Sequence, residues 1–316
     1  MDNVIVNIQR EALLGRKDRA WRKRGSVVFI AYRMNDPDSR RMRANLAQSI
    51  QQIDSEIVIL DGNVPQGVPW ANEVRERISR GQLLVIDVTG PSREVMFEFG
   101  FASNKPFIPI VHHPEDRDSL PAWLTAFQIS AFGETGLPLL AAEIVSILRT
   151  DFQKSAAYRR PPAVPGMIIW LESNSSSRFG DSYERVSNLA QRYSLNILRV
   201  DPRDLLSYDD LRQFLRAWMV ISCMDGGPSD HAGHFFLGDI AGRRRAGSGA
   251  GHGQSLHRRG IALIPTEEDL PLLVADSVRR MSRNVLTLLT LDNILRETEP
   301  IFSTYRRWLL SDQEEL

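Results

Sequence analysis

Residues 83–102 read LLVIDVTGPSREVMFEFGFA, and this segment has the pattern of a β-strand, a turn and an α-helix. The apolar run at its start ends at Asp87, which predicts a buried strand. Pro91 and Ser92 provide turn and N-cap chemistry, so a helix is expected to begin near Arg93. A strand that passes through a short turn into a helix is typical of an α/β fold.

Two carboxylates of this segment are candidate catalytic groups. In open α/β sheets, ligands bind beyond the carboxyl ends of the strands. Asp87 is therefore expected at the ligand-binding edge, and Glu98 in the helix that follows it. A carboxylate in this place can attack a ribosyl carbon or stabilise the positive charge that develops on it. A second interpretation of Asp87 stays open, in which its side chain only caps the turn.

Short apolar runs and helices alternate on both sides of this segment. The alternation predicts a parallel, doubly wound sheet in the first half of the chain. The expected strands are 27–32, 56–60, 107–111 and 128–132, and the expected helices are 36–52, 70–80 and 137–151.

A second α/β unit is expected after residues 159–166, RRPPAVPG, whose composition is that of a linker. Its expected strands are 167–171, 196–201, 219–223 and 261–265, and its helices are 183–193, 208–217 and 231–243. The predicted fold is therefore α/β, with two Rossmann-like units and a C-terminal helical tail. The expected divisions are a basic helical lead-in (1–24), a first α/β domain (25–151), a Pro-rich linker (152–166) and a second α/β domain (167–316).

The two halves contain similar short segments. Residues 90–92, GPS, are echoed by residues 227–229, and residues 97–102, FEFGFA, are echoed by residues 235–241, FFLGDIA. Aligning the glycines places Phe236 where the first half has Glu98, so the second half is predicted to be a non-catalytic copy. Chance similarity between two α/β units remains the alternative explanation.

Residues from Leu270 onward are expected to be largely helical, with an apolar stripe that forms either domain core or a subunit interface. The stripe consists of Val274, Val278, Met281, Val285 and Leu288, and it is extended by Ile301, Phe302, Trp308 and Leu309. Since a two-domain chain has less need of such a tail for its own core, we expect a homo-oligomer, most simply a dimer.

Three segments of the first half carry a family resemblance. Asp87-x-Thr89, residues 95–102 (VMFEFGFA) and residues 105–110 (KPFIPI) resemble the nucleoside 2-deoxyribosyltransferase-like families, which share a broad superfamily with TIR-like NAD-cleaving domains. The resemblance covers roughly residues 25–150. It implies that Glu98 is the catalytic glutamate and that Asp87 assists it. The family usually has an asparagine where this chain has Glu94.

The resemblance implies cleavage or transfer at an N-glycosidic bond of a nucleoside, a nucleotide or NAD. No metal or redox cofactor is needed for this chemistry, and NAD enters only as a substrate. Topology adds expected substrate-binding residues at the strand and helix ends: Tyr32, Arg33, Asp61, Trp70, Ser92, Arg93 and Glu94. Analogy with TIR-like domains suggests bacterial defence signalling as a context. Two alternatives are a non-catalytic nucleotide-binding sensor and an interaction subunit of a larger assembly.

Composition indicates a globular chain. It has 316 residues, 42% of them hydrophobic and 25% charged, and its formal net charge is zero, which does not favour nucleic acid or membrane as a partner. The charge is uneven, however. Residues 16–24 contain six basic side chains and one acidic one, and Arg243–Arg245 lie near Arg258 and Arg259. These basic segments either meet a nucleic-acid or protein partner or form solvated surface.

Other features exclude several classes of site. The single cysteine, Cys223, lies in an expected strand and provides no disulfide framework. The spacing of His231 and His234 does not match the helical pair of zinc proteases, so no metal is expected. No segment has the pattern of a signal peptide or a membrane-spanning helix, and a cytoplasmic location is expected.

Overall fold

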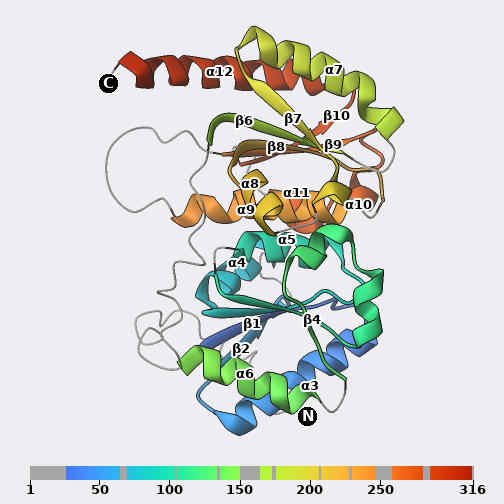
Figure 1. Ribbon diagram of the computed structural model, residues 1–316, viewed down its shortest axis with the longest axis vertical. Coiled ribbons are helices and arrows are strands. Elements are labelled where there is room, and N and C mark those ends of the chain that lie inside the picture. Colours follow the sequence, from blue (N-terminus) through green and yellow to red (C-terminus); the bar gives the residue numbers. More distant parts are fainter. Residues whose placement is uncertain are drawn as a thin grey trace. The chain divides into compact units, whose positions relative to one another are not determined.

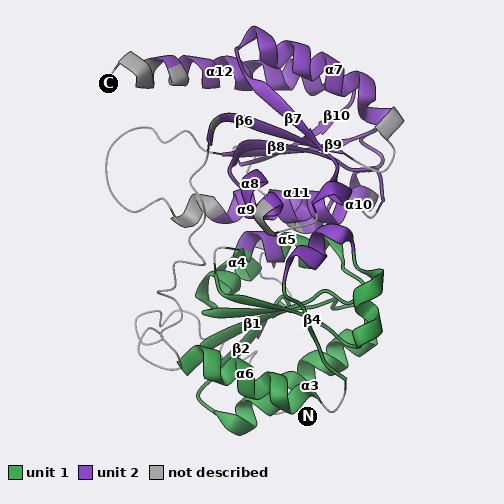
Figure 2. Cartoon of the chain, in the orientation of Figure 1, with its two compact units in different colours: residues 1–98, 102–120, 128–159 green, residues 99–101, 121–127, 160–316 purple. Residues whose placement is uncertain are grey.

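The computed structural model divides into two compact units, which are described separately here (Figure 2). Residues 26–64, 70–103, 105–133, 136–149, 164–172, 176–205, 208–227, 230–246, 258–279 and 285–314 are described. Unit 1 runs to Glu98 and adds Ala102–Leu120 and Gln128–Arg159, and unit 2 comprises Phe99–Phe101, Pro121–Phe127 and Arg160–Leu316. The expected basic lead-in and most of the expected linker lie outside the described residues.

Unit 1 is a parallel five-stranded sheet with helices on both faces (Figure 1). The strand order is β2-β1-β3-β4-β5, and every neighbouring pair is parallel. Helices α3 and α6 cover one face, and α4 and α5 lie on the other. The bounds are β1 (Val27–Ala31), α3 (Pro37–Ile53), β2 (Val58–Asp61), α4 (Trp70–Arg80), β3 (Leu83–Asp87), α5 (Arg93–Ala102), β4 (Phe107–Val111), η1 (Pro114–Ser119), β5 (Ser130–Ala131) and α6 (Leu137–Arg149).

Local sequence explains these elements. Strands β1 and β3 are buried at every position, as expected of a parallel sheet that is covered on both faces. Helix α3 begins where Asp36 caps it, since the Asp36 carboxylate accepts a hydrogen bond from the Ser39 backbone N–H at 2.8 Å. Leu46 and Ile50 of α3 meet Ile144 of α6 in a core from which solvent is excluded.

The strand order of unit 1 reverses between β1 and β3. The chain continues from β1 to β2 on one side, whereas β3 lies on the other side and continues to β4. Ligands of open α/β sheets bind at such a switch point, outside the carboxyl ends of the strands. The residues that follow β1, β2, β3 and β4 therefore surround the expected site.

Unit 2 repeats this topology. Its sheet has the order β10-β9-β8-β6-β7, which is the order of unit 1 when the strands are numbered from β6. In Figure 1, α7 and α12 lie on one face of this sheet and α9 on the other. The bounds are β6 (Val164–Leu171), α7 (Ser176–Arg192), β7 (Asn196–Val200), η6 (Pro202–Asp204), α8 (Tyr208–Phe214), β8 (Ala217–Cys223), α9 (Asp230–Ala246) and β9 (Arg259–Ile264). The predicted fold class, two Rossmann-like α/β units with a C-terminal helix, is confirmed.

The segment after β9 departs from expectation. It contains the short helices α10 (Leu270–Leu273) and α11 (Asp276–Arg279), then the strand β10 (Leu286–Thr290) and the C-terminal helix α12 (Ile294–Glu314). The predicted single apolar helix stripe through this segment is therefore wrong. Leu288 fits the helical spacing, but it also lies in the apolar run Leu286–Thr290, which pairs with β9. Pairing between strands distant in sequence therefore decides the structure of this segment against the local helical pattern.

Several members of the expected stripe belong to the core of unit 2. Val274, Val278 and Val285 are buried, and so are Ile301 and Phe302 of α12. Met281 and the side chains of Trp308 and Leu309 lie outside the described part. The expectation of a homo-oligomer therefore rests on the family resemblance. Among the described helices, none combines the length and apolar character needed to cross a bilayer.

Candidate active site

Glu98 lies in the second turn of α5, at the carboxyl edge of the unit 1 sheet. Ser92 caps this helix, because its hydroxyl oxygen accepts a hydrogen bond from the Val95 backbone N–H at 3.3 Å. Only 4% of Glu98 is exposed. A methyl group added to Gly62, which follows β2, would lie 3.1 Å from Glu98 Oε1. The absence of a side chain at Gly62 therefore leaves room for this carboxyl group.

The surroundings of Glu98 favour its neutral form. Burial raises the pKa of this carboxyl well above its usual value, and the negative charges of Glu94 and Asp61 raise it further. No hydrogen bond to Glu98 from the described residues counteracts these effects. A buried carboxyl without a protein donor costs folding free energy, and such groups are concentrated at functional sites.

Asp61 ends β2 and is held by two arginines. Its Oδ2 lies 2.7 Å from Nη2 of Arg43, and its Oδ1 lies 3.8 Å from Nη1 of Arg77. Both arginines are buried, and Arg77 also donates to the backbone oxygens of Asp61 and Asn63. Asp61 was expected to bind a ribose hydroxyl, whereas the structure places it in a buried ion-pair network with α3 and α4.

Tyr32 follows β1 and packs partly against the core of unit 1. Burial and the charge of Asp61 raise the pKa of Tyr32 to about 12, with a smaller contribution from Glu98. Its phenol is therefore neutral over the physiological pH range. This places an uncharged aromatic group at the same edge as Glu98, as the sequence predicts.

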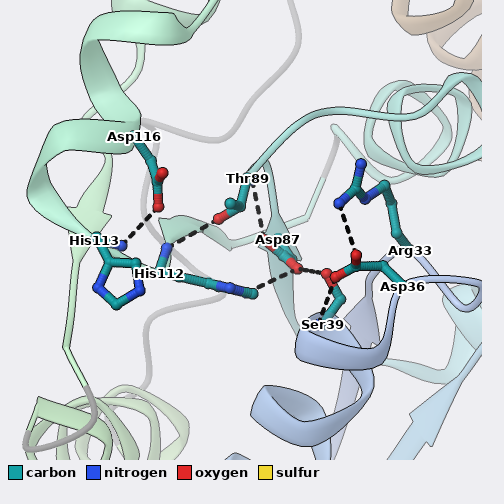
Figure 3. A network of polar contacts seen from close by, with 8 residues as sticks. All are labelled: Arg33, Asp36, Ser39, Asp87, Thr89, His112, His113 and Asp116. Carbon is teal, nitrogen blue, oxygen red and sulfur yellow. Dashed lines mark hydrogen bonds and ion pairs between the residues drawn. The ribbon is translucent and has the colours of Figure 1, made fainter.

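Asp87 ends β3, and its carboxylate is occupied by groups of the protein (Figure 3). Oδ2 accepts a hydrogen bond from the Ser39 hydroxyl at 2.8 Å and lies 3.1 Å from Nε2 of His112. Oδ1 accepts from the Thr89 backbone N–H at 3.0 Å. The side chain of Asp87 is fully buried, so it positions its neighbours and does not face a ligand.

His112 follows β4 and was not among the expected site residues. Its backbone N–H donates to the Thr89 hydroxyl at 2.9 Å, which joins the ends of β3 and β4. The hydrogen bond to Asp87 raises the pKa of His112, and the carboxylates of Asp116 and Asp36 raise it further against the opposing effect of burial. The sequence gives one indication that His112 belongs to the site, which is that it directly follows the predicted strand 107–111.

Arg33 lies over the turn between β3 and α5. Its Nη2 is 3.1 Å from Oδ1 of Asp36, and a methyl group added to Gly90 would lie 3.1 Å from its Nη1 (Figure 3). Gly90 has φ +53°, a conformation that favours glycine. The Arg33 side chain is 38% exposed and stands beside the first turn of α5, where Arg93 and Glu94 are half-buried.

Trp70 begins α4, but its side chain lies outside the described part. The structure therefore brings Tyr32, Arg33 and Glu98 to the carboxyl edge of the sheet, with Ser92, Arg93 and Glu94 at the start of α5. Their assignment as substrate-binding residues stays a prediction. Four further residues contact the carboxylates at this edge from distant segments of the chain. Ser39 and His112 contact Asp87, and Arg43 and Arg77 contact Asp61.

The corresponding edge of unit 2 is filled by its own side chains. Phe236, which the alignment of the glycines matches with Glu98, is buried in α9 with 1% exposure. Asp230 begins α9, and its carboxylate accepts hydrogen bonds from the backbone N–H groups of Asp225 at 3.2 Å and Gly226 at 2.8 Å. The loop amides that could face an anion are thus already bonded to a carboxylate of the protein.

His234 of α9 is bonded at both ring nitrogens. Nδ1 lies 2.6 Å from the backbone oxygen of Asp230, and Nε2 accepts from the Ala275 backbone N–H at 3.1 Å. These partners fix the neutral tautomer with the proton on Nδ1. Within the described residues, no group of three His, Cys, Asp or Glu side chains is placed to hold a metal ion.

Neither a family model nor a curated protein matches the chain. Function is therefore inferred from the chemistry of the site itself.

Proposed function

We propose that unit 1 cleaves or transfers at the N-glycosidic bond of a nucleoside, a nucleotide or NAD, with Glu98 as the catalytic carboxylate. The observation that carries this proposal is the buried Glu98 carboxyl, which lies at the carboxyl edge of a parallel sheet and has no hydrogen-bond donor among the described residues. The transition state of such a reaction is oxocarbenium-like, and a carboxylate beneath the sugar stabilises its positive charge.

The charges around Glu98 suit this role. Glu94 and Asp61 make ionisation of Glu98 unfavourable in the free protein. Positive charge that develops on the sugar in the transition state favours the ionised form of Glu98. The Glu98 carboxylate is therefore more stable in the transition state than in the free protein. Interactions of this kind lower the barrier to the chemical step.

The rest of the site supports a nucleoside or nucleotide. Tyr32 offers a neutral aromatic group for a base. The exposed part of the Arg33 guanidinium can pair with a phosphate, and the first turn of α5 adds the positive end of a helix dipole. Asp36 already neutralises part of the Arg33 charge, so a neutral nucleoside remains within the proposed class.

A second candidate function is nucleotide binding without turnover. It is favoured by the raised pKa of Glu98, which disfavours ionisation of this carboxyl in the free protein, and by the complete occupation of Asp87 by protein groups. In that case the site would bind a nucleotide and signal its presence. The expected difference is binding with no release of free base.

The experiment is to incubate the protein with NAD and a panel of nucleosides and nucleotides and to measure free base by chromatography. Glu98→Gln keeps the size of the side chain and removes its charge, so base release should fall on the order of a hundredfold or more. The matched control is Glu143→Gln, an exposed position of α6, which should leave base release unchanged. Wild-type-like release by Glu98→Gln would refute the role of Glu98. Binding without release by the wild type would favour the sensor.

A further inference from the structure

His112 is a half-buried member of the Asp87 network. The Asp87 side chain is fully buried, and its carboxylate oxygens contact Ser39, Thr89 and His112. The carboxylate is therefore not exposed to a ligand at the site. The side chain of His112 is 13% exposed. His112 is therefore a partner of Asp87 through which this carboxylate can influence a ligand.

The two ring nitrogens of His112 have different surroundings. Nε2 is 3.1 Å from Asp87 Oδ2, and Figure 3 shows the ring directed at this carboxylate. Nδ1 has no hydrogen bond from the described residues. A carboxylate that holds one nitrogen fixes the orientation of the ring and strengthens the basicity of the other nitrogen. The packing of the ring near Phe132, with centroids 6.0 Å apart, also restrains it.

The charges that face His112 come from three elements. Asp87 ends β3, Asp116 lies in η1 and Asp36 caps α3, and all three favour the imidazolium form. Arg33 is paired with Asp36 and reduces the effect of that residue. A free anion is disfavoured beside this group of carboxylates. The arrangement instead suits the transfer of a proton from Nδ1 to a neutral acceptor.

We propose that His112 is the general acid that protonates the departing base, which narrows the substrate to a purine or pyrimidine nucleoside or nucleotide. This inference rests on the proposed N-glycosidic reaction. A purine or pyrimidine leaves as an anion unless a proton is supplied, whereas the nicotinamide of NAD leaves as a neutral molecule. A proton donor in this place is therefore needed for the first class and superfluous for the second.

The proposed step is balanced in atoms and electrons. The bond between the anomeric carbon and the base nitrogen breaks, and its electron pair stays on the base, which takes the proton of His112 Nδ1. Glu98, whose own proton has passed to solvent, stabilises the anomeric carbon or bonds to it, and that bond breaks when the next group attacks. Water, or an acceptor base in a transfer reaction, then attacks that carbon, and Nδ1 takes up the proton that the attacking group releases.

The test compares His112→Gln with His113→Gln on adenosine and on p-nitrophenyl riboside, whose phenolate leaves without protonation. Gln at position 112 can keep a hydrogen bond to Asp87 but has no titratable nitrogen. His112→Gln should cleave adenosine about a hundredfold more slowly and lose the decline in rate at high pH, while cleavage of p-nitrophenyl riboside changes little. The exposed neighbour in His113→Gln should leave both substrates unaffected.

The outcomes separate this inference from the proposed function. Equal losses on the two substrates, or an unchanged pH profile on adenosine, would overturn the role of His112 and leave that of Glu98 standing. If the wild type cleaves neither substrate, the proposed reaction fails. The ¹⁵N resonances of the His112 ring, measured with and without adenosine, then decide whether His112 contacts a ligand. Resonances that do not move would overturn that contact as well.

Discussion

The two sheets have the same strand order, and the alignment of the glycines matches Glu98 of unit 1 with Phe236 of unit 2. Glu98 is a buried carboxyl without a donor among the described residues, whereas Phe236 is a buried ring that lies 5.7 Å from Phe235 between centroids. The loop before the helix differs as well. In unit 2 the Asp230 carboxylate binds the loop amides, and in unit 1 Arg33 lies over Gly90. The same strand order thus carries a buried carboxyl in unit 1 and, in unit 2, a carboxylate that is bonded to its own loop.

The largest expected effect concerns Phe236. Replacing it with alanine should lower the free energy of unfolding by about 3–5 kcal/mol, because the substitution leaves a cavity in a packed core. Urea denaturation measures this change. Glu98→Gln is the matched variant of unit 1 and should not lower stability at neutral pH. A Phe236→Ala protein as stable as the wild type would end the interpretation of this ring as core.

A substitution of Asp230 tests the hydrogen bonds between its carboxylate and the loop before α9. Asp230→Ala leaves the backbone N–H groups of Asp225 and Gly226 without their carboxylate, which should cost about 1–2 kcal/mol. Chemical denaturation of Asp292→Ala, at an exposed turn of the same unit, provides the control and should show no such loss. Equal stabilities of the two variants would show that the Asp230 contacts contribute nothing.

Gly90 tests the turn of unit 1. Gly90→Ala places a side chain at φ +53° and 3.1 Å from the Arg33 guanidinium, so we expect a loss of about 1 kcal/mol and weaker nucleotide binding. Gly133→Ala is the control, since nothing lies within 4 Å of the added methyl group. Thermal unfolding and titration with adenosine monophosphate measure both effects. Unchanged binding by Gly90→Ala would separate this turn from the ligand site.

Local sequence patterns predicted most of the fold. The apolar run that ends at Asp87, and the cap at Ser92, gave the bounds of β3 and α5 almost directly. The same reasoning failed at β10, because residues 285 and 288 fit helical spacing and strand pairing equally well. The pairing of Leu286–Thr290 with β9 decided between them, and such pairing is not visible in a local window.

The site was only partly predictable for the same reason. Glu98 was found from a contiguous motif. Ser39 meets Asp87 across 48 positions of sequence, and His112 meets it across 25. Arg43 and Arg77 sit on helix faces with no local sign that they turn toward Asp61. Contacts of this length follow from the strand order, which the pattern of single elements does not specify.

The most direct test of the central claim, that unit 1 has a buried carboxyl with no hydrogen-bond donor among the described residues, is the pH dependence of stability. The pKa of Glu98 in the folded state is raised above its usual value of 4.5. Its neutral form therefore contributes stability that is fully present below that value and is lost as the pH rises through the folded pKa.

The measurement is the free energy of unfolding of the wild type and of Glu98→Gln, from about pH 4 to about pH 8. The account predicts that the wild type loses stability relative to Glu98→Gln as the pH rises through this range. A difference that stays constant would show that the pKa of Glu98 is not shifted, and a wild type that gains stability as the pH rises would show an ionised and paired Glu98; either result would contradict the claim.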